Sequence, residues 1–145
     1  MRTFKCLIGF IGIFSLFISG CSKESSNELH HEGNKILVEQ RVEEKNKYEA
    51  YKEITDDSTV QKAKDILDSV SWENAKVSMV HPPHYKFYFR AENEQLKFIY
   101  HLWISPNKDK VELIIEGESK YVQLSKSKSA ALFETITGVK LLNVE

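Results

Sequence analysis

Three stretches of alternating apolar and polar side chains dominate the second half of the chain. They run from Tyr85 to Arg90, from Leu96 to Ile104 and from Val111 to Ile115. Successive side chains of a β-strand point to opposite faces, so each stretch predicts a strand with a buried face. Turn-forming residues separate the stretches at 92–94 and 106–109. The pattern therefore predicts consecutive antiparallel strands joined by short turns.

Two amphipathic helices are expected around these strands. Asp56 precedes an apolar series with helical spacing that should end near Ser71. Ser125 opens a second series, and Gly138 is placed to end it in the left-handed conformation. The predicted buried faces consist of Val60, Ala63, Ile66, Leu67 and Val70 in the first helix, and Ala130, Leu132, Phe133 and Ile136 in the second.

The remaining segments show weaker strand patterns. Further strands are expected over residues 36–42, 48–54, 76–80 and 120–124, and a short last strand over 139–144. The order of strands and helices indicates an α+β fold, an antiparallel β-meander of about four to six strands with two helices packed on one face.

The first 20 residues have the layout of a secretory signal. Arg2 and Lys5 form a basic start, and the apolar stretch that follows, about 13 residues long, is too short to span a bilayer core as a helix. It ends in Ile18-Ser19-Gly20-Cys21, which resembles the lipobox of bacterial lipoproteins. The resemblance implies that Cys21 is lipidated and holds the protein on the extracytoplasmic face of a cell membrane. The alternative is an ordinary signal peptide with a chance cysteine after the cleavage site.

The cysteines and the polar sequence after Cys21 define the expected organisation. Cys6 would leave with the signal and Cys21 would carry lipid, so the exported domain has no disulfide and depends on its core. Residues 22–34 lack apolar periodicity and predict a flexible tether, in which His30 and His31 are solvated. We therefore expect a signal peptide over 1–20, a lipidated cysteine and tether over 21–34, and one extracytoplasmic α+β domain over 35–145.

Charge and motifs argue against several functions. The chain has 20 lysines and arginines against 21 aspartates and glutamates, whereas nucleic-acid binders show a basic excess. It has no Gly-x-Ser-x-Gly turn and no glycine-rich phosphate loop. His81, His84 and His101 could form a metal site, but no acidic or cysteine ligands accompany them at a fixed spacing. We expect no catalytic residue, no metal, no other cofactor and no nucleic-acid partner.

The outward-pointing side chains of the meander form a candidate partner-binding face. On the side of the sheet opposite the helices, the alternation would gather Tyr88, Ile99, His101, Trp103 and Ile114. Contiguous apolar and aromatic patches mark interaction sites, and Trp and Tyr are enriched in binding hot spots. The alternative is that the N-terminal strands or the C-terminal segment cover this face.

Three segments resemble small lipoproteins of Gram-positive bacilli. They are residues 72–79 (WENAKVSM), the step Pro82-Pro83-His84-Tyr85, and residues 121–125 (YVQLS) with the helix that follows. The chain is similar to the YhfM-like group over roughly residues 54–138. The resemblance implies an extracytoplasmic α+β domain of unknown function and identifies no catalytic residue.

Together these features predict a membrane-anchored lipoprotein that acts as a non-catalytic binding or accessory module. Its partner would be an envelope protein or peptidoglycan, in addition to the membrane lipid bound through Cys21. One alternative is a small envelope hydrolase or metal-dependent enzyme that uses His81, His84 or His101, and another is a purely structural domain.

Overall fold

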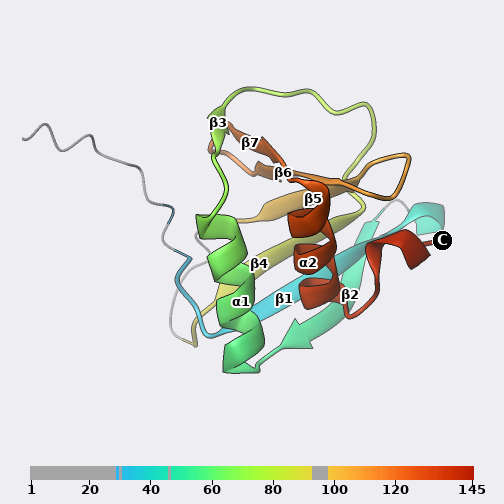
Figure 1. Cartoon of the computed structure of the whole chain (residues 1–145). Helices are drawn as coiled ribbons and strands as arrows, with labels where there is room; N and C mark the ends of the chain where they lie inside the picture. The colour runs from blue at the N-terminus through green and yellow to red at the C-terminus, as the bar shows by residue number, and fades with distance from the viewer. Residues whose placement is uncertain (1–28, 30, 46, 93–97) are drawn as a thin grey trace, which may run out of the picture.

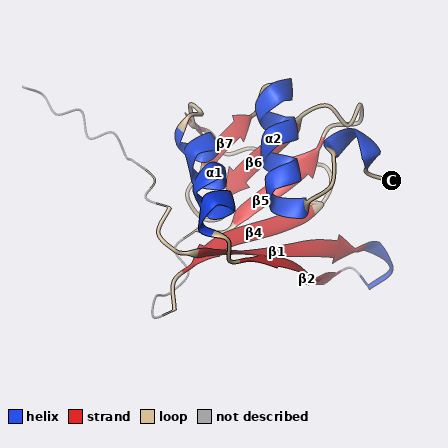
Figure 2. Ribbon diagram, turned by 60° about the horizontal axis from the view of Figure 1, so that its bottom comes forward, coloured by secondary structure: helices blue, strands red, loops and turns tan. Residues whose placement is uncertain are grey.

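The protein folds into one antiparallel sheet with two helices on the same face (Figures 1 and 2). The computed structural model describes residue 29 and residues 31–45, 47–92 and 98–145. In chain order the elements are β1 (Lys35–Val42), the short 3-10 helix η1 (Glu43–Lys45), β2 (Lys47–Ile54), α1 (Asp57–Asp68), β3 (Glu73–Asn74), β4 (Tyr85–Arg90), β5 (Tyr100–Ile104), β6 (Val111–Ile115), β7 (Lys120–Gln123), α2 (Lys126–Thr137) and the 3-10 helix η2 (Leu141–Asn143). The predicted α+β class is confirmed.

The strands lie in the order β2-β1-β4-β5-β6-β7-β3. The meander from β4 to β7 forms the middle of the sheet, the β1–β2 hairpin joins it at β4, and β3 pairs with β7 at the far edge. The sheet has seven strands, more than predicted. The weakly patterned hairpin belongs to the same sheet, and β3 is two residues long, too short to show a periodicity.

Two predicted strands are wrong. Residues 75–79 have no regular secondary structure. After β3 the chain leaves the edge of the sheet beside β7 and must return to β4, which lies three strands away from β7, so it pairs with no strand on the way. The C-terminal segment forms η2 instead of a last strand. The predicted strand from Leu96 also starts later, since β5 begins at Tyr100; residues 96 and 97 lie outside the described residues.

Both helices begin and end as their sequences indicate. The side chain of Asp56 accepts a hydrogen bond from the backbone N–H of Thr59, and the side chain of Ser125 accepts one from that of Lys128. Gly138 ends α2 with φ 79°, in the left-handed conformation that glycine adopts without strain.

The core lies between the sheet and the two helices. Each meander strand contributes its inward row, and the Phe87 and Tyr100 rings of neighbouring strands stack with centroids 4.8 Å apart. The helices contribute Leu67, Leu132 and Phe133, which are fully buried, whereas Ala130, predicted on the buried face, is exposed. In a domain without disulfides, the burial of these apolar side chains is the main favourable contribution to the free energy of folding.

The predicted tether is shorter than expected at its C-terminal end. His31 is buried, and the backbone N–H of Asn34 donates to the carbonyl oxygen of Arg90 at 3.2 Å. Lys64 of α1 donates to the carbonyl oxygen of Gly33 at 2.6 Å. Residues 31–34 therefore pack on the domain.

Candidate functional site

A long segment crosses the face of the sheet opposite the helices. Residues 75–83, which we call the strap, connect β3 at one edge with β4 in the middle of the sheet (Figure 1). The strap begins where the backbone N–H of Ala75 donates to the carbonyl oxygen of Ser119. It then passes over β6 and β5, because its residues line one hollow together with Ile114 and Trp103 of these strands.

Hydrogen bonds fasten the C-terminal half of the strap to the sheet. The indole Nε1 of Trp103 donates to the carbonyl oxygen of His81 at 2.7 Å, and the Tyr48 hydroxyl donates to that of Pro83 at 2.7 Å. Directly after the strap, the backbone N–H of His84 donates to the carbonyl oxygen of Leu102 at 2.9 Å. The exposed strap residue Val80 precedes these attachments, and 90% of its surface is accessible.

The strap changes the interpretation of the predicted partner-binding face. Trp103 is only 7% exposed, so its ring cannot serve as the open contact surface that the alternation suggested. Among the described residues, the strap provides the cover over Trp103. An outward-pointing strand residue is still buried when a segment from elsewhere in the chain crosses over it. The alternating sequence pattern of the strand cannot reveal such a crossing.

Three of the five predicted face residues meet beneath the strap. His101, Trp103 and Ile114 form the floor of a wide hollow of about 500 Å³, and strap residues 77 and 79–83 form its other side. Tyr88 and Ile99 do not line the hollow. Tyr88 instead pairs with Leu37 of β1, farther along β4 than the part that pairs with β5.

His101 is the titratable group on the floor of this hollow. Its Nε2 lies 3.4 Å from a carboxylate oxygen of Glu116, and its ring packs edge-on against Trp103 with centroids 5.9 Å apart. Burial lowers the pKa of His101, nearby Lys86 lowers it further, and Glu116 opposes both effects. The hollow thus presents a half-buried imidazole that the fold favours in its neutral form, beside an exposed carboxylate.

The three histidines of the alternative metal hypothesis do not converge. The Nδ1 of His84 accepts a hydrogen bond from the backbone N–H of Ile104 at 3.1 Å, so that nitrogen is occupied. His84 also lines a different hollow, of about 190 Å³, which it shares with Arg41. Across the described part of the chain, no three His, Cys, Asp or Glu side chains are arranged to hold a metal ion.

A polar cluster that the sequence did not predict joins the buried side chains of His31 and Tyr100 to the exposed carboxylate of Asp68. The Tyr100 hydroxyl and the Nδ1 of His31 are 2.5 Å apart, and the Nε2 of His31 lies 3.1 Å from a carboxylate oxygen of Asp68. Burial raises the pKa of Tyr100, so its phenol stays neutral and can donate to Nδ1. Tyr100 is 0% exposed and could not reach a substrate. The cluster is therefore structural and joins the N-terminal segment to α1 and β5.

Neither described α-helix combines the length and the hydrophobicity that a bilayer crossing requires. Cys21, the predicted lipid attachment site, lies outside the described residues.

The comparisons with known proteins concern the fold and the family. Among solved structures, the fold is similar to the crystal structure of a thioesterase-like protein from Clostridium sporogenes ATCC 15579, with a TM-score of 0.50 and 16% sequence identity. The match covers 73% of this chain and 95% of that chain, and at this identity it shows a likeness of fold alone. Curated proteins gave no match.

The family comparison agrees with the resemblance found in the sequence. The profile of the YhfM protein family matches residues 30–141, which include the strap, both helices and the docked residues 31–34. Because this match extends over most of the chain, the protein belongs to the YhfM family.

Proposed function

We propose that this protein is a lipoprotein anchored to the outer face of a cell membrane through Cys21, and that its domain is a non-catalytic binding module. The basic start, the short apolar stretch and Ile18-Ser19-Gly20-Cys21 support the anchor. Nine residues separate Cys21 from the docked segment that starts at His31, so a lipidated cysteine would keep the domain within about 35 Å of the membrane surface.

The hollow between the strap and the sheet is the observation that carries the binding proposal. Its floor combines the imidazole of His101 with apolar atoms of Ile114 and Trp103, and its other side includes Val77 and Val80, which are exposed. Apolar side chains that remain exposed beside a polar group are typical of interaction sites. We propose an envelope protein or peptidoglycan as the partner, bound by the strap and the floor beneath it.

The anchor is tested by comparing the full-length protein with its Cys21→Ser variant in the producing cell. We expect the unchanged protein in the detergent phase of a Triton X-114 extract, with the mass of a lipidated cysteine. The variant should have the mass of the protein without lipid and should no longer be found in the detergent phase. Equal partitioning of both proteins without a lipid mass would disprove the anchor.

The binding module is tested by crosslinking in membranes, followed by purification of the anchored protein. Val80→Asp adds a charge to the strap without disturbing the core, and Leu142→Asp, at a site 72% exposed, is the matched control away from the strap. We expect the partner to be captured by the unchanged protein and by Leu142→Asp, and lost with Val80→Asp. Equal capture by both variants would exclude the strap as the binding surface.

A hydrolase is the alternative, and the fold shared with a thioesterase-like protein is the observation that favours it. His101, which lines the open hollow, would be the base, and Glu116, with a carboxylate oxygen 3.4 Å from the His101 Nε2, would orient it. The test is hydrolysis of acyl thioesters by the full-length protein and by its His101→Gln variant. Hydrolysis that disappears with this variant would replace the binding proposal with an enzymatic one.

A further inference from the structure

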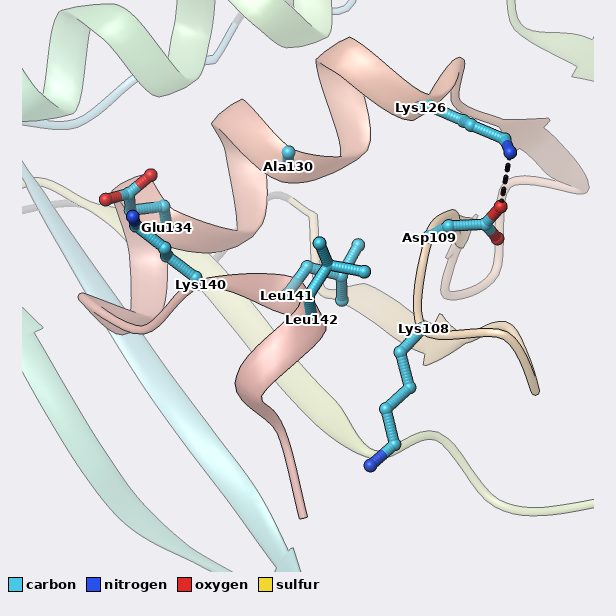
Figure 3. A pocket seen from close by; sticks show the side chains of 8 residues that line it. All are labelled: Lys108, Asp109, Lys126, Ala130, Glu134, Lys140, Leu141 and Leu142. Carbon is cyan, nitrogen blue, oxygen red and sulfur yellow. Dashed lines mark ion pairs between the residues drawn. The ribbon is translucent and has the colours of Figure 1, made fainter.

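A third hollow lies between α2, the C-terminal segment and the β5–β6 turn (Figure 3). Its volume is about 280 Å³. Along α2 its lining residues are spaced by four, which places them on one side of the helix. The lining consists of Lys126, Ala130 and Glu134 from α2, Lys140, Leu141 and Leu142 from the C-terminal segment, and Lys108 and Asp109 from the turn.

The interior of this hollow is open and apolar, because the helix position at its centre is an alanine. Ala130 lies between the charged ends of the α2 stripe, and its methyl group leaves the space open (Figure 3). Leu141 is 2% exposed and contributes the apolar base, whereas Leu142 remains 72% exposed at the border. An apolar ligand group bound in this hollow would remove the surface of the exposed leucine from water, which favours binding.

The lining of the hollow carries one more positive than negative charge, with Lys108, Lys126 and Lys140 against Asp109 and Glu134. Lys126 pairs with Asp109 at 2.8 Å, and this contact lowers the pKa of Asp109, so the two charges balance. Lys108 donates to the backbone carbonyl oxygen of Val144. An ammonium group has three N–H donors, so one such contact leaves Lys108 able to bind an anion. Lys140 and Glu134 contribute opposite charges to the other end of the lining (Figure 3).

We propose that this hollow binds a free, single-chain amphiphile with an anionic head group. Its alkyl chain would lie over Ala130 and Leu141 and cover Leu142, and its head group would contact the ammonium group of Lys108. The volume of about 280 Å³ suits one medium-length alkyl chain. This site is separate from the strap and does not depend on the function proposed for it.

The test uses the full-length protein in phosphatidylcholine vesicles and a diazirine derivative of octanoic acid. After irradiation, mass spectrometry locates the label on the peptides of the chain. We expect labelling of α2 and of residues 139–142, with competition by unlabelled octanoate and not by octylamine, whose head group is cationic. Addition of phosphatidylglycerol to the vesicles should leave the labelling unchanged.

Ala130→Leu fills the hollow at an exposed helix position, and we expect it to reduce the labelling by about tenfold. Ser127→Leu is the matched control, because Ser127 is exposed on α2 but does not line the hollow. Lys108→Gln should weaken the labelling without affecting the core, which keeps the proposal testable if Ala130→Leu fails to fold. Absent labelling, labelling unchanged by Ala130→Leu, or equal competition by octylamine would overturn the proposal, and competition by phosphatidylglycerol would identify membrane lipid as the ligand instead.

Discussion

The indole Nε1 of Trp103 donates a 2.7 Å hydrogen bond to the carbonyl oxygen of His81, and thereby ties β5 to the strap. The two residues are joined across the outer face of the sheet, where the strap has no strand to pair with. The bond explains why an outward-pointing tryptophan is only 7% exposed. A substitution of this single side chain can therefore test the proposed binding surface.

Trp103→Phe should loosen the strap while it keeps most of the aromatic packing. Loss of the hydrogen bond should lower the free energy of unfolding by about 1 kcal/mol. Hydrogen exchange of the backbone amides of residues 77–81 should accelerate more than that of the core strands. Trp72→Phe is the control, since the Nε1 of Trp72 makes a longer bond, 3.4 Å to Leu67, away from the strap. Equal acceleration in both variants would contradict a specific role for the Trp103 bond.

Gly33→Ala should release the docked N-terminal residues. Gly33 has φ 126°, and a Cβ atom there would lie 2.7 Å from the backbone nitrogen of Arg90. Gly117 also has a positive φ, of 80°, but a Cβ there would meet no atom within 4 Å. Gly117→Ala should therefore cost only the conformational strain, about 1 kcal/mol. Urea unfolding should show a larger loss for Gly33→Ala, and equal losses would rule out the steric explanation.

Tyr100→Phe should destabilise the domain more than Tyr85→Phe does. The first change leaves the Nδ1 of buried His31 without the hydroxyl, at a cost of about 1–3 kcal/mol. The second removes a longer contact, 3.2 Å, to the amide of exposed Gln40, which water can replace. Thermal unfolding monitored by circular dichroism compares the two. A smaller effect for Tyr100→Phe would show that the buried cluster contributes little.

The stability of the domain should fall on mild acidification. Burial lowers the pKa of His84 and of His101, so the unfolded chain takes up these protons at a higher pH than the folded one. The contribution is complete above the unfolded-state pKa of about 6.5 and is lost as the pH falls through the lower folded-state pKa values. The free energy of unfolding should thus decrease between about pH 7 and pH 5.

His101→Gln should reduce this pH dependence, because it removes one of the two groups. His81→Gln serves as the control, since the His81 side chain is exposed. Urea unfolding at several pH values measures the slope for each protein. An unchanged slope in His101→Gln would show that His101 titrates alike in the folded and unfolded chain.

Most of the secondary structure was predictable because it depends on local patterns. The row Tyr85, Phe87, Phe89 is buried as its alternation predicted, and Asp56, Ser125 and Gly138 cap the helices as their side chains and backbone freedom indicated. The failures were the segments 76–80 and 139–144. Their apolar residues resemble short strands, but a strand forms only where a neighbouring strand offers a free edge, and that depends on the rest of the sheet.

The candidate sites were less predictable than the fold. Alternation correctly grouped His101, Trp103 and Ile114, because residues on one face of paired strands become neighbours. It could not reveal the strap that covers them. The cluster of His31, Asp68 and Tyr100 had no sequence signal, since its members are far apart in the chain and His31 lies in a polar stretch.

By itself, the sequence determined the α+β class, the helix ends, the inward rows of the meander, the YhfM resemblance and the expectation of a lipid anchor at Cys21. These follow from side-chain periodicity, capping chemistry and short motifs, which operate over a few neighbouring residues. Only the tertiary structure decided the strand order, the course of the strap, the burial of His31 and the hollow beside Ala130. Each of these depends on which distant segments the chain brings into contact, and that is settled by packing of the whole domain.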